Sequence, residues 1–369
     1  MSDKIIDFKK SKEKLLNKKF PNISPIIPLS KEPRYIASNK ALDKFQNILV
    51  KYEDYLMDKS NCKEVKLEEV MIYFNRYFDA VYEELVFFND KRLLKFKEIC
   101  DYAMISNGKR IRPFLMLITY NFCEGEDFLL LAPLMVAIEL IHTFSLIHDD
   151  LPCMDNDELR RGKPTVWKKY GEDMAVLAGD ALLIQANSLL VDMIIEYVFT
   201  EVGSYISTSA SILLKLTGLE GMIAGQVFDV MNTTNKELTL EDLFYMYDKK
   251  TTALLMAGIV IGANMASIYN NKIDRFEKLG MCLGESYQIK DDLLEIEQTT
   301  EIIGKSVDSD KKNNKVTYVS KVGKIASKER LEYLYNTSID IIDSLTSENN
   351  IKESLVFKEV IKYLLNREK

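Results

Sequence analysis

Two clusters of acidic side chains, far apart in the sequence, have the residue types of a magnesium site. The first consists of Asp149, Asp150 and Asp155, and the second consists of Asp291, Asp292 and Glu295. Carboxylates at the C-terminal end of a helix repel one another and oppose the helix dipole, so a bound cation stabilises them. Magnesium takes oxygen ligands and commonly shares them with phosphate groups. The two clusters, with basic residues between and around them, predict a magnesium–diphosphate site.

The spacing within each cluster indicates how its carboxylates are brought together. Asp291 and Glu295 are four residues apart and therefore share one helix face. Asp149 and Asp155 are six apart and cannot share a face of a regular helix. Pro152 lies between them, and a proline that breaks the helix would let the later aspartate turn back toward the earlier one.

A predicted helix before the first acidic cluster also carries a histidine. The chain has only two histidines, and both precede Asp149 by no more than seven residues. His142 lies two helical turns before Asp149, so the two side chains are on nearly the same face. A core histidine satisfied by neighbours is the simplest alternative for this position.

The overall composition is that of a globular protein, and the cysteines indicate that it resides in a reducing compartment. Of 369 residues, 47% are hydrophobic and 28% are charged, and the net charge of −7 argues against broad nucleic-acid binding. The five cysteines are widely spaced without a CxxC pair, which indicates neither a zinc site nor a disulfide framework. The lysine-rich N-terminus lacks the apolar core of a secretory signal. We expect a cytoplasmic protein, with an organelle as the alternative.

Apolar residues recur at helical spacing from residue 41 onward, and no alternating pattern suggests a sheet. We predict an all-α fold, a single bundle of about ten helices around a central cavity. Residues 203–231 and 239–266 are each expected to form one helical block. The proline-containing segment 1–38 is expected to be an extension with little regular structure, followed by a helical domain over 39–369.

An apolar stretch before the first acidic cluster is long enough to suggest a membrane span. It covers residues 128–147 and is interrupted by Pro133, Glu139 and His142 before it reaches the aspartates. A buried core helix fits these interruptions better than a membrane span. We therefore expect no transmembrane segment.

Five sequence blocks occur in a fixed order along the chain. They are GKRIRP (108–113), HDDLPCMDNDELRRGKPT (148–165), GQVFD (225–229), KKTT (249–252) and YQIKDDLLE (287–295), followed by GKS (304–306) and NK (314–315). In these blocks the chain, from about residue 70 to 366, resembles the trans-polyprenyl diphosphate synthases. The resemblance implies the isoprenoid synthase fold, Mg²⁺ as cofactor with three ions, and a homodimer.

The resemblance also assigns ligands residue by residue. Isopentenyl diphosphate would bind to Lys109, Arg112, His142 and Arg161. The allylic diphosphate would face Arg160, Lys250, Lys305 and Lys315. The magnesium ligands would be Asp149, Asp150, Asp155, Asp291, Asp292 and Glu295, the last in place of the family's usual aspartate. The allylic cation would be stabilised by Thr251, Gln288 and the main-chain carbonyl of Lys250.

Product length is expected to depend on the two residues that lie five and four positions before the first motif, Phe144 and Ser145. An aromatic residue at the first position is typical of farnesyl synthases of bacterial type, whereas the small serine leaves room beside it. We expect a synthase of both farnesyl and geranylgeranyl diphosphate, with a farnesyl-only synthase as the alternative.

Two other functions share this fold. A terpene cyclase has a downstream motif of Asn, Ser or Thr, and Glu, which we do not find in the sequence. A non-catalytic regulatory partner of a prenyl synthase usually lacks one aspartate motif, and both are present here. The order of motifs therefore favours the enzyme.

Overall fold

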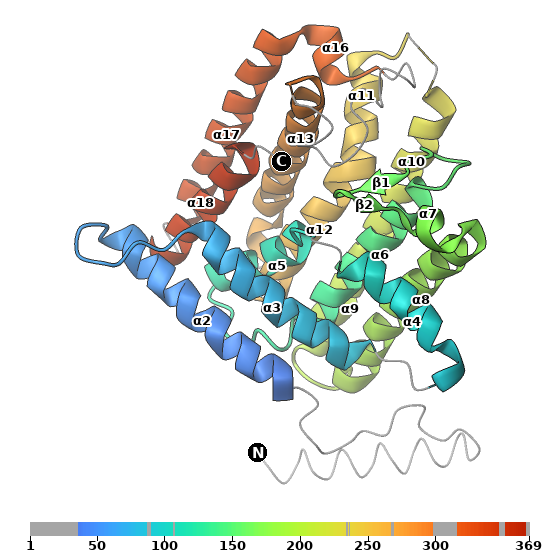
Figure 1. Cartoon of the computed structure of the whole chain (residues 1–369). Coiled ribbons are helices and arrows are strands. Elements are labelled where there is room, and N and C mark those ends of the chain that lie inside the picture. Colours follow the sequence, from blue (N-terminus) through green and yellow to red (C-terminus); the bar gives the residue numbers. More distant parts are fainter. Residues whose placement is uncertain are drawn as a thin grey trace. The chain divides into compact units, whose positions relative to one another are not determined.

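The computed structural model is almost entirely helical (Figure 1). It describes residues 36–86, 90–105, 108–233, 235, 237–266, 269–297, 316–346 and 351–366. The predicted all-α fold is confirmed for these segments. Most of the predicted extension 1–38, together with Lys305 and Lys315, lies outside them. Helix α2 begins at Ile36, close to the predicted start of the helical domain.

The first half of the described chain contributes eight α-helices and one short 3-10 helix. They are α2 (Ile36–Met57), α3 (Leu67–Leu85), η1 (Lys91–Leu93), α4 (Leu94–Met104), α5 (Ile111–Phe122), α6 (Ala132–Asp149), α7 (Val166–Tyr170), α8 (Glu172–Tyr197) and α9 (Gly203–Thr217). The second half begins at α10 and includes one π-helical turn. Its members are α10 (Met222–Asn232), α11 (Leu240–Tyr247), η2 (Asp248–Thr252), α12 (Ala253–Met265), α13 (Tyr269–Glu297), α16 (Tyr318–Val322), α17 (Lys324–Thr346) and α18 (Ile351–Asn366).

Helix α12 is apolar around its whole circumference and lies in the core, as expected for such a helix. It packs against α5 on one side and α13 on another. Gly258 and Gly262 allow the close contact with α5. An added Cβ on Gly258 would lie 2.6 Å from the Arg112 carbonyl oxygen, and one on Gly262 would lie 2.3 Å from the Met116 carbonyl oxygen. This backbone-to-backbone approach fixes the start of α5, which carries part of the site.

Helix α6 is the second core element and packs most extensively against α8. Among the residues that the structure describes, two segments are long and apolar enough to cross a membrane: 128–149, which is 72% buried, and 172–197, which is 39% buried. Burial inside the bundle accounts for the first, as the sequence predicted. The second, α8, has an apolar face that stays exposed in the described part of the structure.

Two local predictions were wrong. The expected continuous block 203–231 is interrupted, because α9 ends at Thr217 and α10 begins at Met222. An added Cβ on Gly221 would lie 2.0 Å from the Leu216 carbonyl oxygen, so only glycine fits this turn. No strand was expected from the sequence, yet the chain after α6 contains a small antiparallel hairpin of β1 (Leu159–Arg160) and β2 (Lys163–Pro164).

Candidate active site

The first acidic cluster lies where α6 ends. Asp149 is the last residue of α6, and the chain after Pro152 folds back over it. The Asp155 main-chain N–H donates to the Asp149 carbonyl oxygen at 2.9 Å. The predicted return of Asp155 toward Asp149 is thus confirmed at the backbone. The two half-buried carboxylates belong to one compact turn.

The electrostatic surroundings of Asp149 favour a bound cation. Burial raises the pKa of Asp149 to about 6. The nearby cations Lys250 and Arg160 oppose this rise, whereas the nearby acids Asp155 and Asp150 add to it. An ionised Asp149 is therefore costly in the metal-free protein at neutral pH. A cation would remove that cost.

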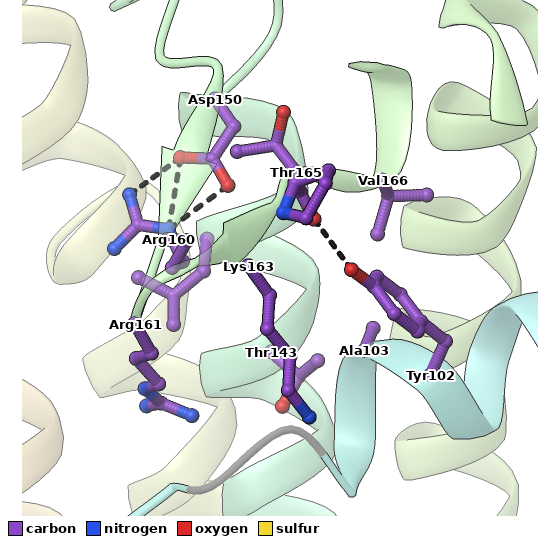
Figure 2. Close-up of a pocket in the computed structure, with 11 residues that line it drawn as sticks. Tyr102, Ala103, Thr143, Asp150, Arg160, Arg161, Lys163, Thr165 and Val166 are labelled. Atoms are coloured by element: carbon purple, nitrogen blue, oxygen red, sulfur yellow. Dashed lines mark hydrogen bonds and ion pairs between the residues drawn. The ribbon is translucent and has the colours of Figure 1, made fainter. Parts of the chain in front are cut away.

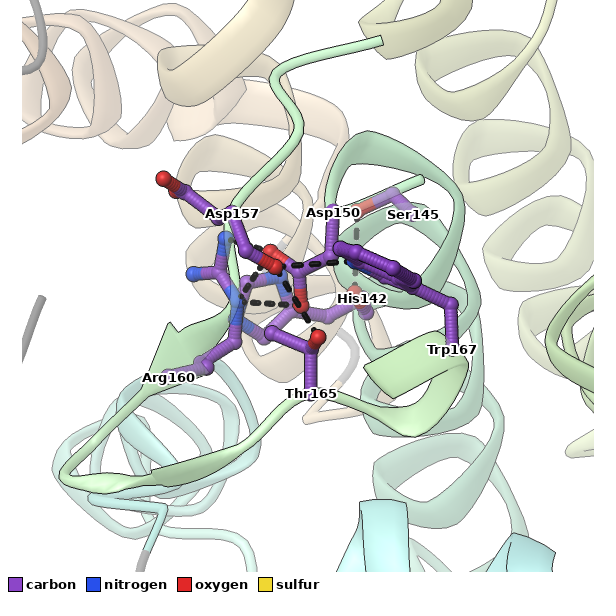
Figure 3. Close-up of polar contacts among 7 residues, drawn as sticks. All are labelled: His142, Ser145, Asp150, Asp157, Arg160, Thr165 and Trp167. Carbon is purple, nitrogen blue, oxygen red and sulfur yellow. Dashed lines mark hydrogen bonds and ion pairs between the residues drawn. The ribbon is translucent and has the colours of Figure 1, made fainter. Parts of the chain in front are cut away.

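The neighbouring Asp150 is already paired. Arg160 Nε donates to both carboxylate oxygens of Asp150, at 2.8 and 2.9 Å, and its Nη2 donates to Oδ1 at 2.5 Å (Figures 2 and 3). Burial raises the pKa of Asp150, and this bidentate contact opposes the shift. The pair ties the hairpin to the end of α6. The predicted roles of Asp150 with metal and Arg160 with diphosphate stay predictions.

The hairpin that carries the two arginines has a well-defined turn. Arg161 (φ 53°) and Gly162 (φ 75°) both adopt positive φ, the pattern of a type I′ hairpin turn. Thr165 Oγ1 and Trp167 Nε1 each donate to the Asp157 carbonyl oxygen at 2.9 Å, which closes its base (Figure 3). Left-handed backbone at an arginine costs about 1–2 kcal/mol, so the local structure must enforce it.

The hairpin tip meets the 108–113 block. An added Cβ on Gly108 would lie 2.7 Å from Arg161 Nη1, so glycine allows the loop and the guanidinium to approach. Lys109 follows, with its Nζ 5.9 Å from the centre of the Tyr363 ring on α18. Two motifs about fifty residues apart in the sequence are therefore adjacent in space.

Arg110, which the sequence interpretation did not assign, has a structural role in this loop. Its Nη2 donates to Asp79 Oδ1 at 2.8 Å and to the Met104 carbonyl oxygen at 2.9 Å. Its guanidinium also lies over the Phe78 ring at 5.0 Å, and its φ is 47°. A GKR string suggests a phosphate contact for each cation. Burial and left-handed backbone show instead that Arg110 shapes the turn between Lys109 and Arg112.

Three of the predicted isopentenyl diphosphate ligands, Arg112, His142 and Arg161, interact electrostatically in a desolvated, positively charged cluster. The pKa of His142 is lowered well below its usual value by burial and by Arg112, Arg161 and Arg160. His142 is therefore neutral at pH 7. Burial also lowers the pKa of Arg112, and its buried Nε makes no hydrogen bond with any part of the chain that the structure describes. Such a positively charged cluster favours the binding of an anion.

A small pocket adjoins this region beside the hairpin. It lies between α4, α6 and the hairpin (Figure 2). Asp150, Arg160 and Arg161 line it, and Tyr102 on α4 closes one side by donating to the Pro164 carbonyl oxygen at 2.7 Å. Because the pocket shares both arginines with the candidate site, we regard it as an extension of that site.

A π-helical turn carries the predicted catalytic pair. Within η2, Lys250 Nζ donates to Asp229 Oδ2 on α10 at 2.7 Å, and Thr251 Oγ1 donates to Gln288 Oε1 on α13 at 2.9 Å. An added Cβ on Gly225 would lie 2.2 Å from the main-chain nitrogen of Lys250, so glycine permits the close packing of α10 against η2. Single π turns inside helices are frequent at functional sites because they redirect side chains.

The second acidic cluster lies on α13. Asp291 is half-buried and interacts electrostatically with Arg112 on α5. Asp292 is buried and accepts from Tyr247 Oη at 2.7 Å and from Gln288 Nε2 at 3.1 Å. The side chain of Glu295 lies outside the described part of the structure. The two adjacent aspartates therefore have different surroundings.

The donor set fits magnesium. Asp149, Asp155 and Asp291 offer hard carboxylate oxygens, the ligands that Mg²⁺ prefers. Within the described ranges, no three acidic, histidine or cysteine side chains converge on one point. Diphosphate oxygens would therefore have to complete the coordination, as magnesium sites for phosphorylated substrates commonly require.

Comparisons with known proteins identify the family of the chain. Residues 94–348 match the model of the polyprenyl synthetase family. A farnesyl diphosphate synthase from Geobacillus stearothermophilus is 42% identical over 239 residues, which cover 65% of this chain and 79% of that one. A chloroplastic geranylgeranyl pyrophosphate synthase from Capsicum annuum is 40% identical over 232 residues, 63% of this chain and 62% of that one.

Solved structures give the same result. A geranyltransferase from Legionella pneumophila superposes with a TM-score of 0.68 at 25% identity, covering 81% of this chain and 97% of that one. A geranyltransferase from Helicobacter pylori, complexed with magnesium and isoprenyl diphosphate, has a TM-score of 0.63 at 27% identity, covering 88% and 96%. The fold is that of the isoprenyl synthases. The chain belongs to the polyprenyl synthetase family.

Proposed function

We propose that the protein is a short-chain prenyltransferase that condenses isopentenyl diphosphate with dimethylallyl, geranyl and farnesyl diphosphate. The products are farnesyl and geranylgeranyl diphosphate, the compounds that the two named synthases among its relatives make. The observation that supports this most strongly is the desolvated, positively charged cluster of Arg112, His142 and Arg161, in which Arg112 also interacts electrostatically with Asp291 of the second acidic motif. A second anion site is expected around Lys250.

The predicted site residues would hold and orient two diphosphates together with magnesium. Three Mg²⁺ ions, held by Asp149, Asp155 and Asp291 and supported by the other predicted acids, would neutralise the allylic diphosphate and improve it as a leaving group. Lys250 would give up its hydrogen bond to Asp229 and bind the diphosphate instead. Thr251, Gln288 and the Lys250 carbonyl would present oxygens to the allylic cation, with no strong nucleophile beside it.

Condensation would require the two diphosphates to be bound side by side. Arg112, His142 and Arg161 would hold isopentenyl diphosphate so that its double bond attacks the allylic cation. The C–O bond of the allylic diphosphate breaks, a C–C bond forms, and a proton then leaves to the released pyrophosphate. The buried surroundings exclude water, which would otherwise capture the cation.

A primer-extension assay tests the proposal. Purified full-length protein would receive Mg²⁺, labelled isopentenyl diphosphate and one of the three allylic diphosphates. We expect extension of each primer and products of fifteen and twenty carbons. Products that stop at fifteen carbons would favour the farnesyl-only alternative. No extension of any primer would refute the enzyme and favour the regulatory partner.

Phe144 is the first residue expected to change product length. It lies on α6 with its ring 5.8 Å from that of His148, and it is buried. We expect Phe144→Ala to shift the products toward longer chains, because the space of the ring becomes available to the growing tail. Chromatography of the dephosphorylated products measures this. Phe144→Leu should give a smaller shift, and an unchanged product distribution in both variants would remove Phe144 from the cavity floor.

We also propose a homodimer formed through α8. Leu177, Ile184, Val191 and Ile195 recur on one face of this helix and are 51%, 64%, 52% and 56% exposed. A contiguous apolar face of this kind marks an interaction surface. Ile184→Asp combined with Ile195→Asp should convert the dimer to a monomer in analytical ultracentrifugation, because it places charges in the interface. Ile325→Asp on α17, at an isolated position that is 78% exposed, is the control. A monomeric wild type, or a variant that stays dimeric, would contradict the proposal.

We propose a cytoplasmic location for the enzyme. Relatives named as chloroplastic keep an organelle as the alternative. The negative net charge argues against nucleic acid as a partner.

A further inference from the structure

A chain of hydrogen bonds joins α16, α11, α13 and η2 beside the candidate site. The Tyr318 main-chain N–H donates to Tyr247 Oη at 2.9 Å, and Tyr247 Oη donates to Asp292 Oδ2 at 2.7 Å. Gln288 Nε2 donates to Asp292 Oδ1 at 3.1 Å, and Thr251 Oγ1 donates to Gln288 Oε1 at 2.9 Å. We call these five residues the Asp292 relay.

The direction of each hydrogen bond in the Asp292 relay follows from chemistry. A main-chain N–H can only donate, so Tyr247 Oη accepts from Tyr318 and gives its own hydrogen to Asp292. The same N–H also lies 3.2 Å from Asp292 Oδ2. A carboxylate can only accept, so the nitrogen of the Gln288 side chain must face Asp292. The Gln288 oxygen then faces Thr251, whose hydroxyl must donate.

The relay is held in place by packing. Tyr247, Ile289, Leu293 and Tyr318 belong to a separate apolar cluster of α11, α13, α16 and α17, and the Tyr247 and Tyr318 side chains are almost fully buried. An added Cβ on Gly284, one turn before Gln288, would lie 2.3 Å from Thr252 Oγ1, so η2 lies directly against α13. These contacts keep Thr251 within reach of Gln288.

We infer that Asp292 is a positioning residue that fixes the direction of the Asp292 relay. The Thr251 hydroxyl then donates its hydrogen to Gln288 and presents its oxygen lone pairs to the allylic cation. This role rests on the proposed prenyltransferase function and replaces direct metal binding by Asp292. A hydroxyl hydrogen aimed at the cation would repel it, whereas the oxygen attracts it. Asp291, the adjacent acid, remains the magnesium ligand.

Asp292→Asn tests the relay with almost no change of shape. The amide oxygen would accept from Tyr247, and its NH₂ group would face Gln288. Gln288 would then turn its oxygen toward this NH₂ group and its nitrogen toward Thr251, which would have to accept. The Thr251 hydrogen would point to the substrate. We expect kcat to fall about 10- to 100-fold, with little change in KM for the allylic diphosphate.

A double-mutant cycle with Thr251→Val separates positioning from general damage to the fold. If Asp292 acts through the Thr251 hydroxyl, the double variant should have nearly the kcat of Thr251→Val alone. Asp101→Asn is the matched control, because Asp101 accepts from Tyr82 Oη at 3.0 Å in a similar Tyr–Asp contact between α3 and α4. Its kcat should equal that of the wild type.

Three results would overturn the inference. Multiplicative effects in the cycle would show that Asp292 acts independently of Thr251. An increased Mg²⁺ concentration for half-maximal rate in Asp292→Asn would show that the carboxylate binds metal. An unchanged kcat would show that bond direction is irrelevant. If the wild type itself does not extend any primer, the proposed function fails, and the inference fails with it.

Discussion

Replacing Asp149 by asparagine lowers kcat by about three orders of magnitude and makes the metal-free protein more stable. The loss of rate follows from the loss of a carboxylate that holds magnesium on the leaving diphosphate, an interaction worth several kcal/mol in the transition state. The gain in stability follows from the surroundings of Asp149 in the ligand-free protein. Burial raises the pKa of this carboxyl to about 6.

The pH dependence of the stability gain has a definite sign. An aspartate whose pKa is raised on folding binds its proton more tightly in the folded state. Its ionisation therefore destabilises the fold progressively as the pH rises from about 4 to about 6, and the full cost is present above that range. The cost is roughly 1–3 kcal/mol, since each pKa unit corresponds to about 1.4 kcal/mol and partial exposure reduces it.

Calorimetry in EDTA checks this part of the prediction. Asp149→Asn should unfold a few degrees above the wild type at pH 7.5 and show little difference at pH 4. Asp150→Asn is the contrasting variant. It should unfold at a lower temperature, because Arg160 would lose the carboxylate that it grips with three hydrogen bonds. An Asp149→Asn enzyme with more than a tenth of the wild-type kcat would contradict the role of Asp149.

Replacing Arg112 by alanine raises KM for isopentenyl diphosphate about 100-fold and leaves KM for the allylic substrate nearly unchanged. Arg112 is desolvated, as its lowered pKa reflects, and its Nε has no hydrogen-bond partner within the described segments. A diphosphate can satisfy this guanidinium in two places at once. Loss of such a contact, about 3 kcal/mol, corresponds to about two orders of magnitude in affinity.

Steady-state kinetics with each substrate varied in turn measures the Arg112 effect. Arg92→Ala is a suitable control, because Arg92 in η1 is exposed and pairs with nearby Asp90. It should have wild-type constants. If Arg112→Ala instead raised KM for the allylic diphosphate more than that for isopentenyl diphosphate, the assignment of the two anion sites would be reversed.

Helical periodicity predicted most of the fold, and its failures have physical reasons. The break between α9 and α10 depends on Gly221, whose lack of a Cβ permits a chain reversal without a proline or a polar loop. Apolar residues on both sides conceal it. The β1–β2 hairpin has only two residues per strand, too few for a period-two pattern. Its sequence signal is the Arg161–Gly162 turn, which does not resemble the usual Asn–Gly.

The sequence predicted which residues form the site, and the structure shows that neighbouring members of this set have different surroundings. Adjacent residues on a helix point about 100° apart, so Asp149 and Asp150, or Asp291 and Asp292, need not have the same surroundings. The sequence does not tell which member of each pair turns inward. Arg160 is ten residues after Asp150, and Tyr247 is 45 residues before Asp292. Such partners become visible only once the helices are packed.

Anomalous diffraction from crystals of the full chain grown with Mn²⁺ and a bisphosphonate tests the central claim most directly. Manganese can replace magnesium at oxygen ligands, and its anomalous signal locates each ion. We predict ions that bridge the bisphosphonate to Asp149 and Asp155 on one side and to Asp291 on the other. Carboxylates of Asp149 and Asp291 that face separate regions of solvent, with no ion between them, would contradict the account.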